Sequence, residues 1–212
     1  MKRTSRTFGT TSGSRRVVSK SDALALMIAS AIAAVATTAA TVSGTIAYFV
    51  GPVTLPLPLA TAHQSPTGLF LGAEAHFTSV EATIPSLPPA EAALLAWAGV
   101  MSQIAILAVL TLLFLLALRL RGENLFTAGS VSIVGSCGAV LAIAGTVGQV
   151  IDQVARGRLA EAIGANKRTA EESIIFIGNF NFNPIVAGIV LVLVAGVFQF
   201  GRRLQKDTEG LV

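Results

Sequence analysis

The fold is decided by residues 92–151, which read AALLAWAGVMSQIAILAVLTLLFLLAL (92–118), RLRGENLFT (119–127) and AGSVSIVGSCGAVLAIAGTVGQVI (128–151). The first and last segments contain no charged residue, and each exceeds the roughly 20 apolar residues that a helix needs to cross a hydrocarbon core. The short segment between them makes the two crossings neighbours. We therefore predict a transmembrane helical hairpin with a basic tip.

The composition of the whole chain extends this prediction to a polytopic membrane protein. Of 212 residues, 53% are hydrophobic and only 12% are charged, about half the charged share of a soluble domain. The net charge of +4 comes from basic residues at the ends of apolar runs, so it indicates membrane topology and no direct contact with nucleic acid. The single cysteine, Cys137, excludes an internal disulfide and a thiolate metal cluster.

Two more crossings flank the hairpin and complete a membrane domain over residues 23–200. We expect spans at about 23–50 and 174–200, the latter with an alternative start after Pro184, and a Pro-rich outer loop at 52–89 that contains no Lys or Arg. Residues 1–22 are basic and poor in apolar side chains, so we expect a disordered cytoplasmic tail, and residues 201–212 form a second cytoplasmic tail. The predicted fold is an all-α bundle of four transmembrane helices.

The first span allows two interpretations. The Ser14-Arg15-Arg16 sequence resembles a twin-arginine export signal, but the apolar segment 23–50 is far longer than the signal's roughly 7–15 apolar residues. We therefore favour a retained span. Its many Ala and Thr residues, with Ser43 and Gly44, let helices approach closely in lipid, so we expect it to pack inside the bundle. Residues 75–84 alternate in a pattern that is typical of a strand, and residues 151–163 indicate a short interfacial helix.

The distribution of positive charge predicts the orientation. Eleven of the fifteen Lys and Arg residues fall in the amino tail, the 119–127 turn and the carboxyl tail, and four fall after the third span. Because cytoplasmic flanks hold the excess of positive charge, we expect both termini on the cytoplasmic side of a bacterial inner membrane.

Two sets of residues are candidate contact sites. A basic belt on the cytoplasmic side is suited to anionic lipid or to an acidic or DNA-binding protein partner, and it consists of Arg119, Arg121, Arg202, Arg203 and Lys206. A row of small residues on the third span recurs every three or four positions and predicts a groove that receives another helix, and it consists of Gly135, Gly138, Ala142 and Gly145.

Other polar residues give weaker signals. Imidazole and carboxylate groups can bind transition metals or titrate near neutral pH, but the four in the outer loop have no recognised ligand spacing; they are His63, Glu74, His76 and Glu81. Asn179, Asn181 and Asn183 could line a polar path, although helix capping is the simpler interpretation. No span carries a charge at its centre and no catalytic motif or cofactor-binding loop is present in the sequence, so we expect neither an enzyme nor a cofactor.

The turn and the carboxyl end resemble a bacterial family of small four-span membrane proteins known as a domain of unknown function. The resemblance is carried by Gly122-Glu-Asn-Leu-Phe-Thr127 and by Phe198-Gln-Phe-Gly201-Arg-Arg-Leu204 with the acidic end that follows. It departs from the family at Leu125, where proline is frequent. Such proteins are often encoded beside a small Cro/CI-like helix-turn-helix repressor, so the resemblance implies membrane-linked regulation.

These observations leave three hypotheses about function. The first is a non-enzymatic regulatory or sensory membrane protein whose outer loop 52–89 faces the stimulus and whose basic belt faces a cytoplasmic partner. The second is an accessory or assembly subunit of a larger membrane complex, with small-residue faces that pack against foreign helices. The third, an enzyme or transporter with a site at 179–183, has the least support.

Overall fold

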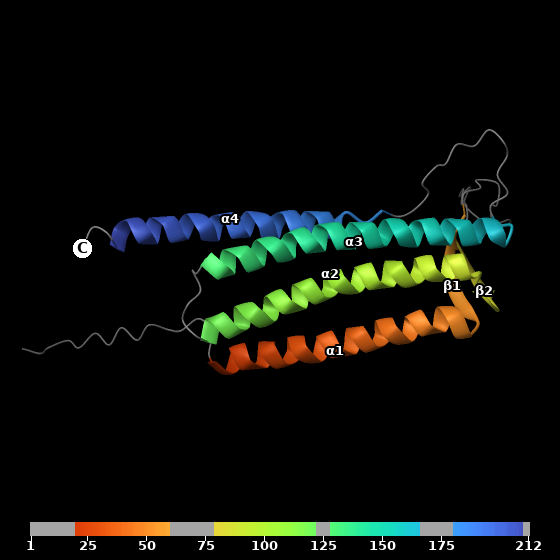
Figure 1. Ribbon diagram of the computed structural model, residues 1–212, viewed down its shortest axis with the longest axis horizontal. Helices are drawn as coiled ribbons and strands as arrows, with labels where there is room; N and C mark the ends of the chain where they lie inside the picture. Colours follow the sequence, from red (N-terminus) through yellow and green to blue (C-terminus); the bar gives the residue numbers. More distant parts are fainter. Residues whose placement is uncertain (1–19, 60–78, 122–127, 166–179, 210–212) are drawn as a thin grey trace, which may run out of the picture.

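Four long helices and one small sheet make up the protein (Figure 1). The computed structural model describes residues 20–59, 79–121, 128–165 and 180–209, and within these ranges it leaves the side chains of 20, 121, 128 and 204–209 undescribed. In chain order the elements are α1 Lys20–Val50, β1 Val53–Pro58, β2 Ser79–Ile84, α2 Pro89–Arg121, α3 Ala128–Ala162 and α4 Asn183–Glu209.

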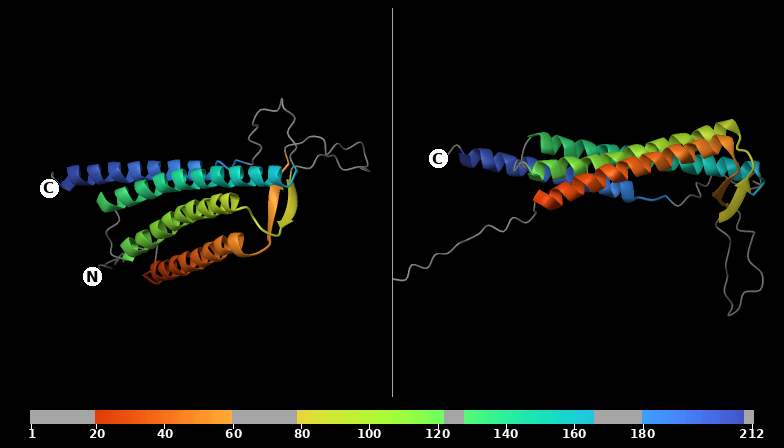
Figure 2. Two further views of the ribbon diagram at one scale, coloured as in Figure 1. Left: turned by 45° about the vertical axis from the view of Figure 1, so that its right-hand side comes forward. Right: turned by 90° about the horizontal axis from the view of Figure 1, so that it is seen from below.

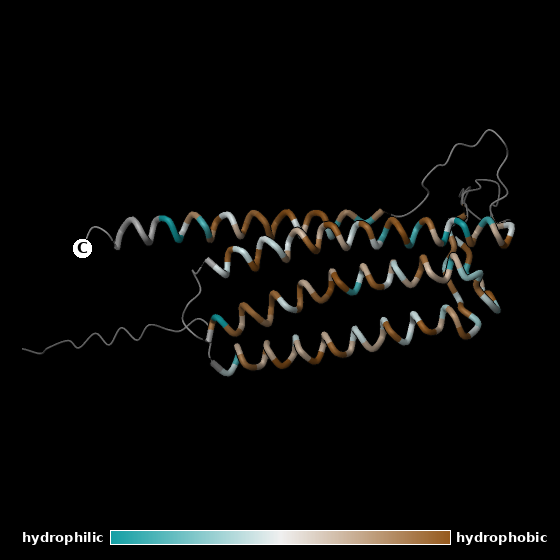
Figure 3. Tube along the Cα trace, in the orientation of Figure 1, coloured by the Kyte–Doolittle hydropathy of each residue, from teal (hydrophilic) through white to brown (hydrophobic). Residues whose placement is uncertain are grey.

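All four helices are long and apolar enough to cross a membrane, which confirms the prediction of a multi-pass helical membrane protein. Their apolar stretches lie side by side (Figure 3). Many large apolar side chains are exposed on the outer helices, for example Val35 on α1 at 72% and Leu193 on α4 at 64%. Such exposure would be costly in water, so we take these surfaces as the ones that contact lipid tails.

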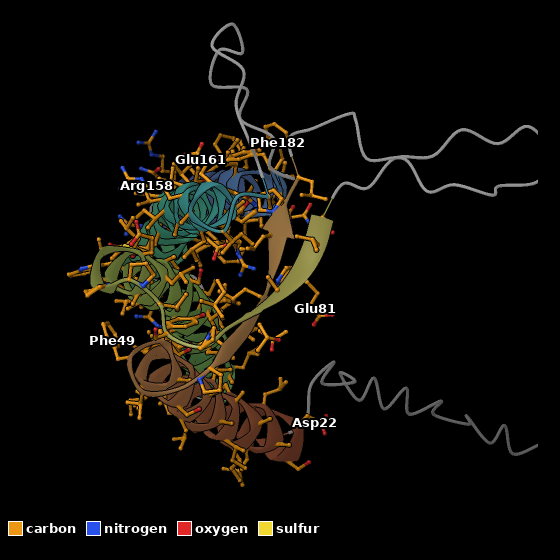
Figure 4. The ribbon with its side chains drawn as sticks, turned by 90° about the vertical axis from the view of Figure 1, so that its right-hand side faces the viewer. Asp22, Phe49, Glu81, Arg158, Glu161 and Phe182 are labelled. Atoms are coloured by element: carbon orange, nitrogen blue, oxygen red, sulfur yellow. The ribbon has the colours of Figure 1, made fainter. Side chains whose placement is uncertain are left out.

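The helices pack in chain order, with α1 against α2, α2 against α3 and α3 against α4. Seen along their length they form an arc whose open side lies between α1 and α4 (Figure 4). The sequence predicted a bundle of four helices without their arrangement, and the structure leaves one side of it open. The expectation that α1 packs inside is wrong, because α1 stands at one end of the arc and contacts α2 along one face (Figure 2).

A two-stranded antiparallel sheet corrects the all-α prediction. Strands β1 and β2 pair with Val53 opposite Ile84 and Pro58 opposite Ser79. The sequence pattern anticipated only the second strand, because prolines inside a strand normally argue against one. Here Pro56 and Pro58 are two residues apart, so their missing N–H groups point to the same side, away from β2, and remove no hydrogen bond of the ladder.

The sheet packs chiefly on the last turns of α3, which extend beyond α1 and α2 at that end (Figure 1). At 35 residues α3 is about 52 Å long, and a hydrocarbon core is about 30 Å thick. Leu57 of β1 and Leu159 of α3 are almost fully buried in one cluster, together with Leu95 of α2. The expected interfacial helix at 151–163 is therefore the continuation of α3, and its apolar face is covered by β1.

Helix α4 matches one of its two expected starts and differs from the expected span at its end. It begins at Asn183, next to the alternative start after Pro184 and not near 174, and residues 166–179 lie outside the described ranges. Helix α4 also continues through the predicted tail to Glu209, so its last turns project beyond the start of α3 (Figure 1). The amino tail, residues 1–19, lies outside the described ranges as well.

Candidate functional site

The α1–α2 interface contains a polar cluster at the centre of both helices. The Gln103 side chain is 7% exposed and lies among three threonines of α1. Its amide nitrogen donates to Thr37 Oγ1 at 3.2 Å and to Thr38 Oγ1 at 2.9 Å, and its oxygen accepts from Thr41 Oγ1 at 3.0 Å. Both amide hydrogens are thus used, and the cluster fastens α1 to α2 where unsatisfied polar groups are most costly.

The predicted small-residue groove is the face of α3 on which α4 lies. A Cβ atom built on Gly138 would be 2.8 Å from the backbone oxygen of Gly188, and one built on Gly145 would be 2.7 Å from Cβ of Pro184. Ala142 and Gly135 contact Gly188 and Ala195 in the same row. The groove is therefore occupied by a helix of the same chain and leaves no room there for a foreign helix.

Asn181 caps the start of α4. Asn181 Oδ1 accepts the backbone N–H of Asn183 at 2.9 Å, which begins the first turn. The backbone N–H of Asn181 donates to Gln149 Oε1 at 2.9 Å and so ties this start to α3. Asn179 lies outside the described residues. Asn181 therefore has a structural role at the helix start, and Asn183 is exposed at the first position of α4.

The basic belt divides into residues with different environments. Arg119 is half-buried: its Nη1 donates to Oγ of the fully buried Ser130 at 2.6 Å, and its guanidinium lies over Gly129. It therefore joins the end of α2 to the start of α3. Arg202 and Arg203 are exposed near the projecting end of α4. The side chains of Arg121 and Lys206 are outside the described set, although both residues are helical.

At the opposite end, a charged residue couples α3 to the sheet. Arg156 Nε donates to Asp152 Oδ2 at 2.7 Å, and its Nη1 donates to the carbonyl oxygen of Pro56 at 3.1 Å. The carboxylate holds the guanidinium in place so that it can cover the β1 edge. Together with the Leu57 cluster, this contact defines a small cap at this end of the helices, consisting of β1, β2 and residues 151–162 of α3 (Figure 4).

The weaker candidates form no site within the described residues. Those residues include no group of three or more His, Cys, Asp or Glu side chains able to hold a metal ion. Glu81 is exposed on β2, while His63, Glu74 and His76 lie outside the described ranges. Cys137 is partly buried and packs beside the cluster of Leu112, Val134 and Ala195, as a small apolar residue would.

Sequence reasoning missed the two polar residues that join elements, Gln103 and Arg156. A signal existed for Gln103, because it is the only amide side chain in the 92–118 run and Thr37-Thr38 lies near the middle of the first span. For Arg156, the spacing to Asp152 is that of a helical ion pair. Neither signal identifies the backbone oxygen of Pro56 as a partner, because that contact spans 100 positions in sequence.

The fold and these contacts define a class, a multi-pass helical membrane protein with a small two-stranded sheet at one end of its helices. Comparison with protein-family models, with curated proteins and with solved structures gave no match. The resemblance to the four-span family therefore stays a prediction.

Proposed function

We propose that the chain is a non-enzymatic regulatory or sensory protein of a bacterial inner membrane, in which the outer cap faces the stimulus and the basic belt faces a cytoplasmic partner. The single observation that carries the proposal is the continuity of α3. This one helix contacts β1 at its outer end, receives α4 along its middle and holds Arg119 through Ser130 at its other end.

A continuous helix gives the two ends a mechanical connection. A ligand that shifts β1 also shifts Arg156 and the outer part of α3, and the close backbone contact at Gly138 transmits such a shift to α4. Packed interfaces tend to move between discrete arrangements, so a small displacement at the cap reaches the projecting end of α4. That end is the part most suited to a partner, since Arg202 and Arg203 are exposed there.

The proposed orientation follows from charge. Arg119, Arg202 and Arg203 lie at one end of the helices, and the cap lies at the other. With the remaining basic residues of the amino tail and the turn, the first end carries eleven Lys and Arg residues, which favours the cytoplasm. The Pro-rich segment 52–89 is then extracytoplasmic. The partner that fits the basic belt is an acidic protein surface or anionic lipid. Direct binding of nucleic acid is not part of the proposed function.

The experiment compares transcription in a strain that lacks the chain with strains that carry the wild type, Arg156→Gln or Arg158→Gln. Arg158 is an exposed neighbour on α3 and serves as the matched control. We expect both the deletion and Arg156→Gln to change transcript levels, because each removes signal transfer from the cap, and we expect Arg158→Gln to behave as wild type. Unchanged transcripts in the deletion strain would contradict the proposal.

A second candidate, an accessory subunit of a larger membrane complex, is favoured by α1. Among the helices, this one packs chiefly against α2, and its remaining surface combines Ala and Thr with exposed Ile32, Val35 and Val42. Purification in mild detergent separates the candidates. Stoichiometric recovery of unrelated membrane subunits supports the accessory role, and purification without them supports the regulator.

A further inference from the structure

The two edges of the cap sheet differ in their capacity to bind another strand. The outer edge of β1 cannot accept one, because Pro56 and Pro58 have no N–H to donate and Arg156 already occupies the Pro56 carbonyl. Natural sheets protect their edges with devices of this kind. The β1 edge is therefore closed.

Within the described residues, the outer edge of β2 has no such protection. In the register of the sheet, Ser79, Glu81 and Thr83 face Pro58, Pro56 and Thr54, so their backbone N–H and C=O groups point away from β1. All three residues are exposed, and their backbone groups on this edge make no hydrogen bond within the described part of the chain. The edge contains no proline and no lysine. Only another extended backbone can satisfy these groups in a regular ladder.

We propose that β2 pairs with β2 of a second copy of this chain, forming a four-stranded antiparallel sheet across a two-fold axis normal to the membrane. A shared bilayer holds two copies at the same depth and in the same orientation. Their β2 edges therefore lie at the same height along the membrane normal and can pair. The strands run across the ends of the helices instead of along them (Figures 1 and 4), so a bilayer that the helices cross has the strands roughly in its plane. A two-fold axis along the helices therefore makes the facing strands antiparallel.

The side chains select one register. If Glu81 faced Glu81 of the second copy, two carboxylates would lie opposite each other, which is destabilising. Centring the axis on Ala82 instead places Glu81 opposite Thr83 of the second copy and Val80 opposite Ile84 of the second copy. Val80 and Ile84 share the face of the sheet that holds the buried Leu57, so this register extends the apolar side of the cap.

The arrangement of the four helices is compatible with this pairing. Strand β2 lies on the same side of the molecule as the open side of the helical arc (Figure 4). Pairing through β2 therefore turns the open sides of two copies toward each other. The pairing is independent of the regulatory function, because it rests only on the edges of the sheet and on the shared membrane.

The test uses cysteine cross-linking of the full chain in membranes, in a Cys137→Ala background. In the proposed register the two Ala82 residues form a non-hydrogen-bonded antiparallel pair with Cα atoms about 4.5 Å apart, within the range that a disulfide spans. We expect Ala82→Cys to give a disulfide-linked dimer on mild oxidation. Thr54→Cys, at an exposed position on β1, is the control and should remain monomeric.

A proline substitution then tests the backbone pairing. The N–H of Thr83 points away from β1, so Thr83→Pro preserves the internal ladder and removes a donor from the open edge. We expect Thr83→Pro to reduce the Ala82→Cys dimer to the level of the Thr54→Cys control, while Thr83→Val leaves it intact. Circular dichroism checks that all variants keep their helices. Equal cross-linking at 82 and 54, an unchanged dimer with Thr83→Pro, or cross-linking of the Ala82→Cys variant to a different protein would overturn the proposal.

Discussion

Gly138 of α3 and Gly188 of α4 are in direct backbone contact. A Cβ atom on Gly138 would lie 2.8 Å from the carbonyl oxygen of Gly188, and a Cβ atom on Gly188 would lie 2.6 Å from the carbonyl oxygen of Gly138. Both distances are shorter than any side chain tolerates, so the two helices approach this closely only because neither residue has a side chain. The contact fixes the position of α4 on α3.

Replacing Gly188 with alanine should therefore separate the two helices. We expect Gly188→Ala to lower the free energy of unfolding by about 1–3 kcal/mol, the usual cost of overpacking a tight interface. The measurement is equilibrium unfolding in mixed micelles of mild detergent and SDS. Gly196→Ala on the same helix is the control, because a Cβ atom there meets nothing within 4 Å. Equal destabilisation by both variants would show that the close contact is not what matters.

The polar cluster of Gln103 should stabilise the α1–α2 pair to a modest extent. Gln103→Met keeps the size of the side chain and removes three hydrogen bonds, each worth about 0.6 kcal/mol in a membrane interior, so we expect a loss of about 2 kcal/mol. The same unfolding assay measures this loss. Ser102→Ala, at an exposed neighbouring position, is the control and should change little. If Gln103→Met had the same free energy of unfolding as the wild type, the prediction would be contradicted.

Arg156 should hold the outer cap against α3. Arg156→Gln removes the ion pair with Asp152 and the bond to the Pro56 carbonyl, and because these groups are partly exposed we expect a loss of about 1 kcal/mol. The local effect is the sharper measurement: hydrogen exchange in β1 and β2 should accelerate while exchange in the middle of α2 stays unchanged. Arg158→Gln should leave exchange in both regions as in the wild type.

The buried leucine of β1 should matter more to the cap than Arg156 does. Leu57 is 0% exposed among Leu95, Ala155 and Leu159. We expect Leu57→Ala to destabilise the cap by about 2–5 kcal/mol, as for other buried leucines, and to make the sheet sensitive to proteolysis. Pro58→Ala, on the opposite face of β1, is the comparison. Resistance to protease in the Leu57→Ala cap would mean that this cluster does not hold the sheet.

The proposed orientation predicts which positions a membrane-impermeant thiol reagent reaches in intact cells. In a Cys137→Ala background, Glu81→Cys should be labelled from outside and Arg203→Cys only after the cells are opened, since both residues are exposed and lie at opposite ends of the helices. The reverse pattern would invert the topology, and labelling of both positions in intact cells would contradict an even number of crossings.

The sequence was sufficient to predict the four crossings and the face of α3 that carries a helix. Long uncharged runs are a strong signal, because every backbone group in lipid must be satisfied within the segment. The row Gly135, Gly138, Ala142 and Gly145 follows the helical repeat, so its common face could be derived before any neighbour was known. Which helix lies on that face could not be derived from the sequence, since any apolar helix fits such a row.

The cap and the open arc of helices could not be predicted from the sequence pattern. Strand β1 contains two prolines, and whether they are tolerated depends on which side the partner strand occupies. The pairs Gln103–Thr38 and Arg156–Pro56 join residues 65 and 100 positions apart, so their formation depends on how whole helices are placed. The open arc also escapes prediction, because lipid covers an apolar helix as well as a neighbouring helix does.

The prolines of β1 also limit how far the sheet can grow. A sheet with two receptive edges can recruit strands without end, which is the route to fibrous aggregates. With one edge of each hairpin blocked by Pro56 and Pro58, strand addition through the cap stops after a single symmetric pairing. Pro56 and Pro58, which are unusual residues in a strand, thus limit assembly through the sheet to a pair of chains.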